Sequence, residues 1–245
     1  MKHVIEIEDE RCSVLTPEGS LLVAFTPTFQ PIFKQDYQAL FGFECLPEMQ
    51  FNAGEDYSFA NFFRDADIHC IRSLVLEQVK FSVQFIQKTK CRVSVNLDMS
   101  DLCDPHFCQQ VLALSVPNLV LELDGYDLDD NQEIQLAKNL RQFEKTGVEL
   151  WLDNYDARDS SHHHYLKLRE WDGVKFAPDF SEYISQKMAK LALFTKLKNH
   201  ADKIIIDGVK KDHQHEFSKM NGAYSQGGHY SYPLYAQEAR QFVGC

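Results

Sequence analysis

Basic charge is scarce in this sequence. Its 245 residues include 25 Lys and Arg against 36 Asp and Glu, which gives a formal net charge of -11. Phosphate backbones are bound by clustered Lys and Arg, so this balance argues against direct binding of DNA or RNA polymers. The net negative charge still allows binding of a small anionic ligand, provided that metal ions or a local Lys offset the acidic side chains.

Long apolar runs are also lacking. None reaches the roughly 18 residues that a membrane-spanning helix needs. The first residues, Met1 to Glu6, lack the charged start and the apolar core of a signal peptide. We therefore expect a cytoplasmic protein that does not bind membranes. With 44% hydrophobic and 25% charged residues, the composition is that of a globular protein with a sizeable core.

The cysteines lack the pairing expected of a disulfide framework or a zinc site. There are seven, an odd number, without a C-x-x-C pair: Cys12, Cys45, Cys70, Cys91, Cys103, Cys108 and Cys245. This favours free thiols in a reducing compartment. Cys103, His106 and Cys108 could suggest zinc, but no second Cys/His half-site accompanies them. Cys45 is interpreted as a small core residue.

The pattern of apolar runs predicts a single domain over residues 21–245, preceded by an irregular or weakly paired extension over residues 1–20. Residues 21–33 and 39–46 are predicted to be strands of an antiparallel hairpin, because a short polar connection joins them. Strands and helices then alternate, which predicts an α/β fold with a mostly parallel sheet. We expect helices near 67–88, 105–114, 131–146, 160–169, 182–199, 210–219 and from 236, and strands near 92–97, 118–123, 148–153, 173–176, 203–207 and 223–226.

Polar residues occur where these short strands end. Asn96, Glu122, Asp153, Lys175 and Asp207 each follow an apolar run. In a barrel of parallel strands alternating with helices, all such strand ends emerge on one rim. The sequence therefore predicts one polar cup at that rim, although a single carboxylate at a strand end more often caps a helix or pairs with a surface Lys.

This set of residue types suits metal-assisted phosphodiester cleavage. Glu44, Asn96, Glu122, Asp153 and Asp207 could supply oxygen ligands to two hard divalent cations. Lys175 could orient a water molecule or stabilise charge. Their joint placement at strand ends is what favours this interpretation over separate structural roles.

A series of short motifs, in order along the chain, resembles the EAL domain family of TIM-like barrels, which act on or bind cyclic di-GMP. The family motif Y-Q-P-I is similar to Phe29-Gln30-Pro31-Ile32, and the end of G-F-E-A-L is similar to Phe43-Glu44-Cys45-Leu46. The motif V-N-L-S is similar to Ser94-Val95-Asn96-Leu97, and L-E-I is similar to Leu121-Glu122-Leu123. The place of D-D-F-G is taken by Leu152-Asp153-Asn154-Tyr155, and that of D-G-L-K by Asp172-Gly173-Val174-Lys175. The place of E-G-V is taken by Asp207-Gly208-Val209. The closing Q-G-Y-x-F-S-x-P-L is similar to Gln226-Gly227 together with Tyr232-Pro233-Leu234. The resemblance implies a TIM-like (β/α)8 barrel of EAL type with an antiparallel strand near the N-terminus.

The resemblance also implies roles for particular residues. Lys175 and Glu44 take the positions of catalytic residues, and Gln30, Gln226 and Pro233 those of ligand-binding residues. The implied cofactor is Mg²⁺ or Mn²⁺, if metal binding is retained. Its ligands would be Glu44, Asn96, Glu122, Asp153, Asn154 and Asp207.

Several departures from the family pattern fall at these positions. Asn154 replaces an aspartate, and Asp207 is one methylene shorter than the family glutamate. Glu48 stands in place of an arginine, and Gly125 in place of the second glutamate of L-E-I-T-E, which in the family steadies the loop after the next strand. That loop, residues 155–159, is itself changed. The loss of a carboxylate at Asn154 is expected to weaken the binding of a divalent cation, and the anion at Glu48 is expected to weaken the binding of a phosphate group.

We therefore expect a degenerate EAL-type regulatory protein in cyclic di-GMP signalling, with a protein partner and with residual binding of the dinucleotide. The alternative is an active metal-dependent phosphodiesterase that produces pGpG, because Glu44, Asn96, Glu122, Asp153 and Lys175 are all present. No separate sensor, GGDEF or DNA-binding domain fits in this length. A homodimer through the barrel's helices is common in the family.

Three further features have structural interpretations beside functional ones. His162, His163 and His164 are interpreted as a solvated helix start instead of a metal site. The acidic stretch over residues 124–130 is interpreted as capping for the next helix instead of a Ca²⁺ site. Aromatic residues between the hairpin and the first helix are interpreted as core, with a partner-binding face as the alternative: Phe51, Tyr57, Phe59, Phe62 and Phe63.

Overall fold

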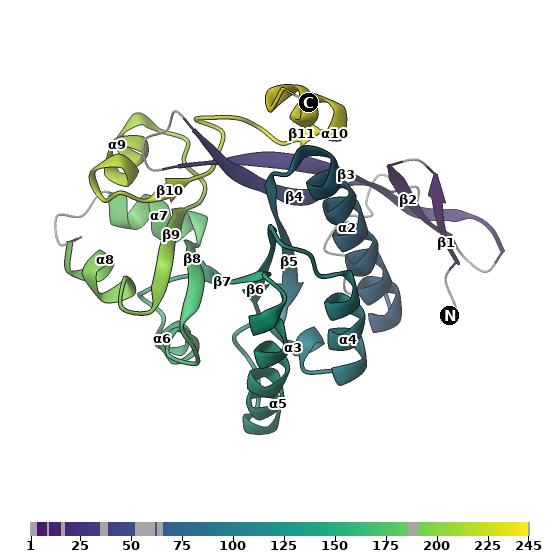
Figure 1. The fold of residues 1–245 in the computed structure, drawn as a ribbon, viewed down its shortest axis with the longest axis horizontal. Helices are drawn as coiled ribbons and strands as arrows, with labels where there is room; N and C mark the ends of the chain where they lie inside the picture. Colours follow the sequence, from purple (N-terminus) through teal and green to yellow (C-terminus); the bar gives the residue numbers. More distant parts are fainter. Residues whose placement is uncertain are drawn as a thin grey trace.

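The strands form one sheet that closes on itself into a barrel (Figure 1). The computed structural model describes residues 4–8, 10–15, 18–34, 39–51, 62, 66–185 and 191–244. Within these residues the barrel strands are β3 (Leu21–Phe33), β4 (Leu40–Phe51), β5 (Arg92–Asp98), β6 (Leu119–Asp124), β7 (Glu149–Tyr155), β8 (Trp171–Phe176), β9 (Ala201–Ile206) and β10 (Tyr224–Ser225). Neighbours from β4 to β10 run parallel. Strand β3 is antiparallel to both β4 and β10 and closes the barrel, which confirms the predicted TIM-like α/β fold.

Helices cover the outside of the barrel, and Figure 1 shows α2 to α5 outside strands β4 to β6. In the described residues they are α2 (Ile68–Thr89), α3 (Met99–Leu102), α4 (Pro105–Leu114), α5 (Asp130–Leu140), the 3-10 helix η1 (Arg141–Lys145), α6 (Ser160–Leu166), α7 (Pro178–Ser185), α8 (Leu191–Leu197), α9 (Asp212–Met220) and α10 (Ala236–Phe242). None of them is long and apolar enough to serve as a membrane span.

Two predicted helices differ from those observed. The helix expected over 131–146 turns into a 3-10 helix from Arg141, before Gly147 takes a positive φ of 77°. The helix expected over 182–199 begins earlier, because Pro178 at its first turn is compatible with a helix start. Its described parts are α7 and α8, and residues 186–190 lie outside the described residues.

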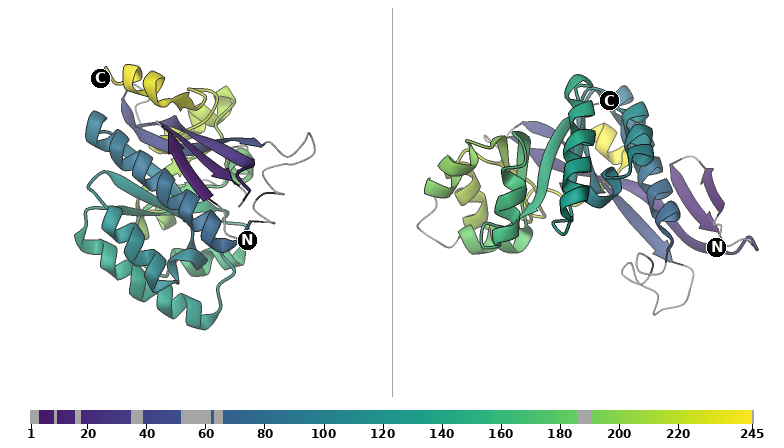
Figure 2. Two further views of the ribbon diagram at one scale, coloured as in Figure 1. Left: turned by 90° about the vertical axis from the view of Figure 1, so that its right-hand side faces the viewer. Right: turned by 90° about the horizontal axis from the view of Figure 1, so that it is seen from below.

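The N-terminal residues are more regular than expected. Strands β1 (Val4–Glu8) and β2 (Arg11–Leu15) form an antiparallel pair, and β2 continues onto β3. Figure 2 shows these strands, in purple, extending the sheet beyond the barrel. Cys12 and Val14 are fully buried in a cluster with residues of α2 such as Leu74. Of the two alternatives predicted for this extension, irregular or weakly paired, the described residues are paired, because burial of alternate side chains stabilises the pairing.

The barrel interior is filled below its polar rim by a small apolar cluster. Side chains alternate across a strand, so Ile32, Val120, Trp151 and Ile205 face inward and pack together. The Trp151 indole N–H donates to Glu149 Oε2 over 3.0 Å. This packed floor closes the barrel interior beneath the strand ends.

Gly173 makes room for the Trp151 ring. A Cβ on Gly173 would lie 2.9 Å from Trp151 Cγ, which is too close for a buried ring held by a hydrogen bond. We expect Gly173→Ala to lower the free energy of unfolding by about 1–3 kcal/mol, the usual cost of overpacking. Denaturant unfolding would measure it. The loss should shrink in a Trp151→Phe background, and an equal loss in both backgrounds would contradict the proposed clash.

Candidate functional site

The strand ends bring the predicted polar residues to one end of the barrel. Each is the next inward-facing position above the apolar floor, as with Val120 and Glu122 or Trp151 and Asp153. The strand register sets Asn96 beside Glu122 and Gln30 beside Glu44. Residues separated by up to 196 positions therefore meet, as in the hydrogen bond from Gln226 Nε2 to Gln30 Oε1 over 3.0 Å.

Lys175 lies between two buried carboxylates at the centre of the site. Its Nζ donates to Glu44 Oε2 over 2.8 Å and to Glu122 Oε2 over 2.7 Å. Burial lowers the pKa of Lys175, but the charges of Glu122 and Glu44 outweigh burial and raise the pKa well above its ordinary value. The lysine is therefore a fixed cation that joins β8 to β4 and β6.

Glu44 has the most complete hydrogen bonding of the group. Besides Lys175, Asn96 Nδ2 donates to its Oε1 over 2.6 Å and Gln226 Nε2 donates to its Oε2 over 2.6 Å. Burial raises the pKa of Glu44, but the charge of Lys175 and these hydrogen bonds hold the pKa below its ordinary value. Gln30 extends the network by donating to the Ser231 carbonyl oxygen over 3.1 Å.

Other carboxyl groups of the site are less satisfied. Glu122 Oε1 is buried without a hydrogen-bond partner among the described residues. Burial and the charge of Glu44 raise the pKa of Glu122 well above its ordinary value. Burial likewise raises the pKa of Asp153 to about 7, against the opposing charge of Lys175, and it also raises the pKa of Asp207. These groups would all be stabilised by an added cation.

A cavity of about 400 Å³ opens above these groups. Besides the predicted residues, its lining includes Asp98 and Asp124, which end β5 and β6 and lie opposite each other in the register. Asp98 was not predicted as a site residue, and Asp124 was considered only within the acidic stretch over residues 124–130, although each directly follows an apolar run as Asp153 does. The full lining is Glu44, Asn96, Leu97, Asp98, Asp124, Asp153, Asn154, Lys175, Pro178 and Asp207.

The donor set suits one hard divalent cation. Glu44, Asn96, Glu122 and Asp153 offer the carboxylate and amide oxygens that Mg²⁺ and Mn²⁺ prefer. The unpaired Glu122 Oε1 and the raised pKa of Asp153 both favour a cation nearby. In the described part of the chain, however, no three His, Cys, Asp or Glu side chains lie close enough together to hold an ion. Bound metal would therefore require side chains to move inward.

The remaining predicted ligands, Asn154 and Asp207, line the cavity but already hold hydrogen bonds. Asn154 has a positive φ of 53°, and its Nδ2 donates to Asp124 Oδ2 over 2.6 Å. Asp207 Oδ1 accepts the Gly208 N–H over 2.6 Å. Pro233 does not line this cavity but a separate groove of about 540 Å³, which Thr28, Leu46, Pro47, Glu48 and Tyr235 also line. A second cation would thus find few ligands pointing toward it.

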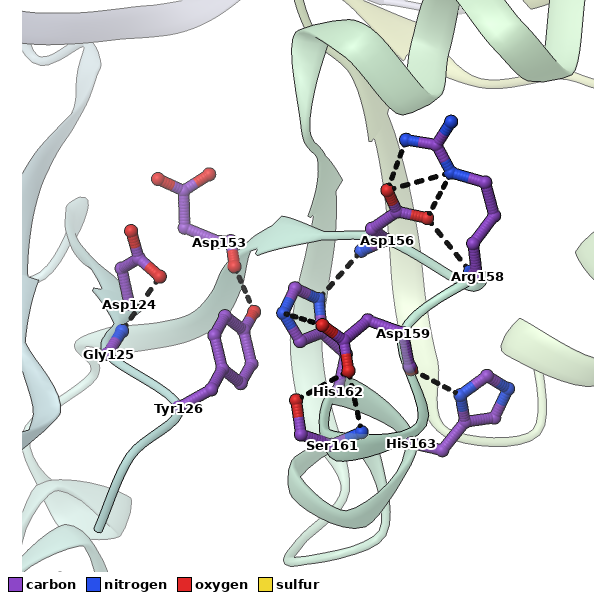
Figure 3. Close-up of polar contacts among 10 residues, drawn as sticks. All are labelled: Asp124, Gly125, Tyr126, Asp153, Asp156, Arg158, Asp159, Ser161, His162 and His163. Atoms are coloured by element: carbon purple, nitrogen blue, oxygen red, sulfur yellow. Dashed lines mark hydrogen bonds and ion pairs between the residues drawn. The ribbon is translucent and has the colours of Figure 1, made fainter.

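One of the three consecutive histidines is not solvated as expected. The His162 ring stacks on Tyr126 at a centroid distance of 3.8 Å and an angle of 15°. Figure 3 shows both rings beside Asp153, whose carbonyl oxygen accepts a hydrogen bond from the Tyr126 hydroxyl. His164 instead contacts Glu133 at the surface, with 2.9 Å between Nε2 and Oε2. The contact between Tyr126 and His162 could not be predicted from the sequence, because it depends on the geometry of the loops that carry them.

The other predictions for individual residues have simple outcomes. Cys45 is fully buried, and burial raises the pKa of its thiol to about 12, in keeping with a core residue. Asp129 caps α5 by accepting the Gln132 N–H over 2.9 Å. Phe51 and Phe62 pack in the apolar cluster against α2. Tyr57, Phe59, Phe63 and Cys245 lie outside the described residues.

Comparison with solved structures supports the fold. The EAL enzyme Bd1971, with cAMP and cyclic di-GMP bound, has a TM-score of 0.67 and 16% identity over 89% of this chain and 64% of that one. An EAL domain protein from Listeria monocytogenes EGD-e has a TM-score of 0.71 and 19% identity over 89% and 92% of the two chains. Klebsiella pneumoniae BlrP1, in a manganese and cyclic di-GMP complex, has a TM-score of 0.66 and 16% identity over 96% and 60%.

These identities show a shared fold, and the chain spans less than two thirds of the length of Bd1971 and of BlrP1. No curated protein sequence matches the chain. The family model described as EAL domain, in contrast, matches residues 22–233. That match covers the whole barrel from β3 to the segment before β11 (Leu234–Tyr235), well over half of the chain. The chain therefore belongs to the EAL domain family.

Proposed function

We propose that the protein is a regulatory EAL domain that binds cyclic di-GMP in the cavity at the strand ends and hydrolyses it weakly or not at all. The observation that carries the proposal is the engagement of Asn154 with Asp124 and of Asp207 with its own loop. Two-metal cleavage needs ligands for both cations, which clamp the attacking and the leaving oxygen. Asn154 and Asp207 also line the cavity, but each already holds a hydrogen bond, so the donors for a second cation are weaker than those for the first.

The chain's own residues suit ligand binding better than turnover. Lys175 lies between the carboxylates of Glu44 and Glu122, so its positive charge is already balanced before a phosphate group binds. A divalent cation held by Glu44, Asn96, Glu122 and Asp153 would supply the positive charge that a phosphate requires. We therefore expect dinucleotide binding to depend on added Mg²⁺ or Mn²⁺.

The second candidate function is an active phosphodiesterase that produces pGpG. It is favoured by the hydrogen bonds that Lys175 makes to Glu44 and Glu122, and by the position of Glu44 and Lys175 in the cavity lining. The structural neighbour BlrP1 is described as a manganese and cyclic di-GMP complex, which is compatible with either candidate.

Incubation of the purified protein with cyclic di-GMP and Mn²⁺ distinguishes the two candidates. We expect calorimetry to detect binding, and chromatography to detect turnover at least about 100-fold below the roughly 1 per second of slow ordinary enzymes. Glu44→Ala is the control, because any residual turnover that depends on this site should disappear. Turnover near 1 per second that Glu44→Ala abolishes would reject the proposal.

Regulation would pass through protein contacts if binding is the chain's only activity toward the dinucleotide. We propose a protein partner and retain the expectation of a homodimer. Exposed aromatic side chains near the groove at β11 provide apolar area for such contacts: Tyr232 is 75% exposed and Tyr235 48% exposed. Affinity capture with and without cyclic di-GMP, followed by loss of capture in Tyr232→Ser, would test this role.

A further inference from the structure

We propose that Tyr126 and His162 form a brace that positions Asp153 at the mouth of the barrel. The brace takes over the role that the resemblance assigns to a glutamate at the position of Gly125. Its consequence for ligand binding rests on the proposed function, whereas the brace itself concerns only the end of β7. Both residues act through Asp153 and are therefore positioning residues.

The need for a brace arises from the irregular end of β7. Leu152 is the last residue of this strand that pairs with β6, and it pairs with Val174 of β8. The pairing with β8 then shifts and resumes at Tyr155. Asp153 and Asn154 therefore lie outside the ladders that hold the rest of the strand. Asp153 has no paired residue in either ladder, and a buried backbone carbonyl needs a hydrogen-bond partner.

Tyr126 supplies that partner. Its hydroxyl donates to the Asp153 carbonyl oxygen. Burial raises the pKa of Tyr126 well above its ordinary value, so the hydroxyl keeps its proton and stays a donor. The ring is held from two sides, by the parallel face of His162 at 3.8 Å and by the edge of Tyr165 at 5.2 Å and 81°. The donor is thus fixed in direction before any ligand binds.

His162 ties the stack to the loop that follows β7. Its Nδ1 accepts the Asp156 N–H over 2.9 Å, so the Nδ1 atom carries no proton and we assign the proton to Nε2. That nitrogen lies 4.0 Å from Asp159 Oδ2 at the start of α6. Figure 3 shows the resulting chain of contacts from Tyr126 through His162 to Asp156. The His162 ring therefore contacts residues near both ends of the loop over residues 155–159, and it stacks on Tyr126, which follows β6.

Gly125 cannot carry the brace itself. Its φ is 95°, and a Cβ at this position would lie 2.9 Å from Asp98 Oδ1. Its N–H donates to Asp124 Oδ1 over 2.7 Å, while Asp124 Oδ2 accepts from Asn154. Asp124 and Tyr126 thus hold Asn154 by its side chain and Asp153 by its carbonyl. A side chain at position 125 would be strained by the positive φ, so the bracing contact comes from the neighbouring Tyr126.

The test uses variants that separate the two contacts. Tyr126→Phe keeps the stacked ring and removes the donor, and His162→Phe keeps the stack and removes the Nδ1 acceptor. Tyr165→Phe is the matched control, because it removes a hydroxyl from a ring of the same cluster whose partner is the Leu128 N–H instead of β7. His162→Asn offers an acceptor oxygen without the stack and tests partial rescue.

Amide hydrogen exchange, measured without ligand, is the first readout. We expect Tyr126→Phe to speed exchange at residues 153–156 about tenfold or more, with Tyr165→Phe unchanged there. His162→Phe should expose the Asp156 amide, and His162→Asn should restore part of its protection. Wild-type exchange in Tyr126→Phe, or equal acceleration by Tyr165→Phe, would overturn the brace.

Calorimetric titration with Mn²⁺ is the second readout. If the wild-type protein binds Mn²⁺, Tyr126→Phe should weaken binding several-fold while Tyr165→Phe leaves it unchanged. Unchanged Mn²⁺ affinity in Tyr126→Phe, despite faster exchange, would overturn the positioning role. If the wild-type protein binds neither Mn²⁺ nor cyclic di-GMP, the proposed function fails, and the exchange data alone decide on the brace.

Discussion

Replacing Lys175 by methionine should lower the free energy of unfolding at pH 7 by about 3–5 kcal/mol, the cost of leaving a buried charge without its partner. The Lys175 side chain is 2% exposed, and those of Glu44 and Glu122 are 6% and 0% exposed. Methionine fills a similar volume but leaves the two carboxylates facing each other without a cation. Denaturant unfolding at pH 7 would measure the loss.

The pH dependence of this loss follows from the carboxyl groups. Without Lys175, burial and mutual repulsion should raise the pKa of Glu44 as they already raise that of Glu122. A carboxyl group whose pKa is higher in the folded than in the unfolded protein binds its proton more tightly when folded. Its protonation therefore stabilises the fold at low pH, and this stabilisation is lost as the pH rises above the unfolded value near 4.3. The deficit of Lys175→Met should accordingly be smaller at pH 5 than at pH 7.

Two further variants control for the removal of a lysine as such. Lys203 Nζ lies 3.3 Å from Glu149 Oε2, with both side chains 19% exposed, so Lys203→Met should cost only about 1 kcal/mol or less. Adding Glu44→Gln to Lys175→Met removes one of the facing charges and should recover part of the stability. Equal losses for the two lysines, or no recovery, would show that the central charge cluster does not stabilise the fold as argued.

The predictable part of the fold is the part that periodicity and topology determine. Short apolar runs ending in polar residues placed β5 to β9 within a few residues, because parallel strands alternate with helices and end on one rim. The bounds of β1 and β2 were not predicted, because short, partly exposed strands depend on burial against α2, which no local pattern reveals. The 3-10 ending of the helix from Arg141 likewise depends on local packing.

The site divides in a similar way. Strand-end positions and the choice of ligand residues predicted that Glu44, Glu122 and Lys175 would meet. Lys175 Nζ lies 2.8 Å from Glu44 Oε2 and 2.7 Å from Glu122 Oε2. The direction of Asn154 could not be predicted, because it depends on a positive φ and on Asp124 across a neighbouring strand. Tyr126 and His162 were beyond sequence reasoning for the same reason, since their contact joins two irregular loops.

Exchanging Asn154 for Asp and Glu48 for Arg in one protein should raise the affinity for cyclic di-GMP in the presence of Mn²⁺ by about tenfold or more, and each single change should give less. Asn154 now donates to Asp124, whereas an aspartate has no proton to donate and would be repelled by that carboxylate. The new carboxylate gains most by turning toward a cation in the cavity. Arginine at position 48 replaces an anion of the neighbouring groove by a group that binds phosphate through two parallel hydrogen bonds.

The control for this pair is a charge reversal of equal size away from the site. Asp212 is 97% exposed at the start of α9, so Asp212→Arg changes the net charge as Glu48→Arg does without changing the groove. Calorimetry at two salt concentrations would measure the affinities. If Asp212→Arg raised the affinity as much as Glu48→Arg, the gain would come from the net charge alone and should disappear in salt, since at about 0.1 M salt charges more than about 10 Å apart are largely screened. A gain specific to the double variant would show that the cavity keeps the geometry for the dinucleotide and lacks only the charges to hold it.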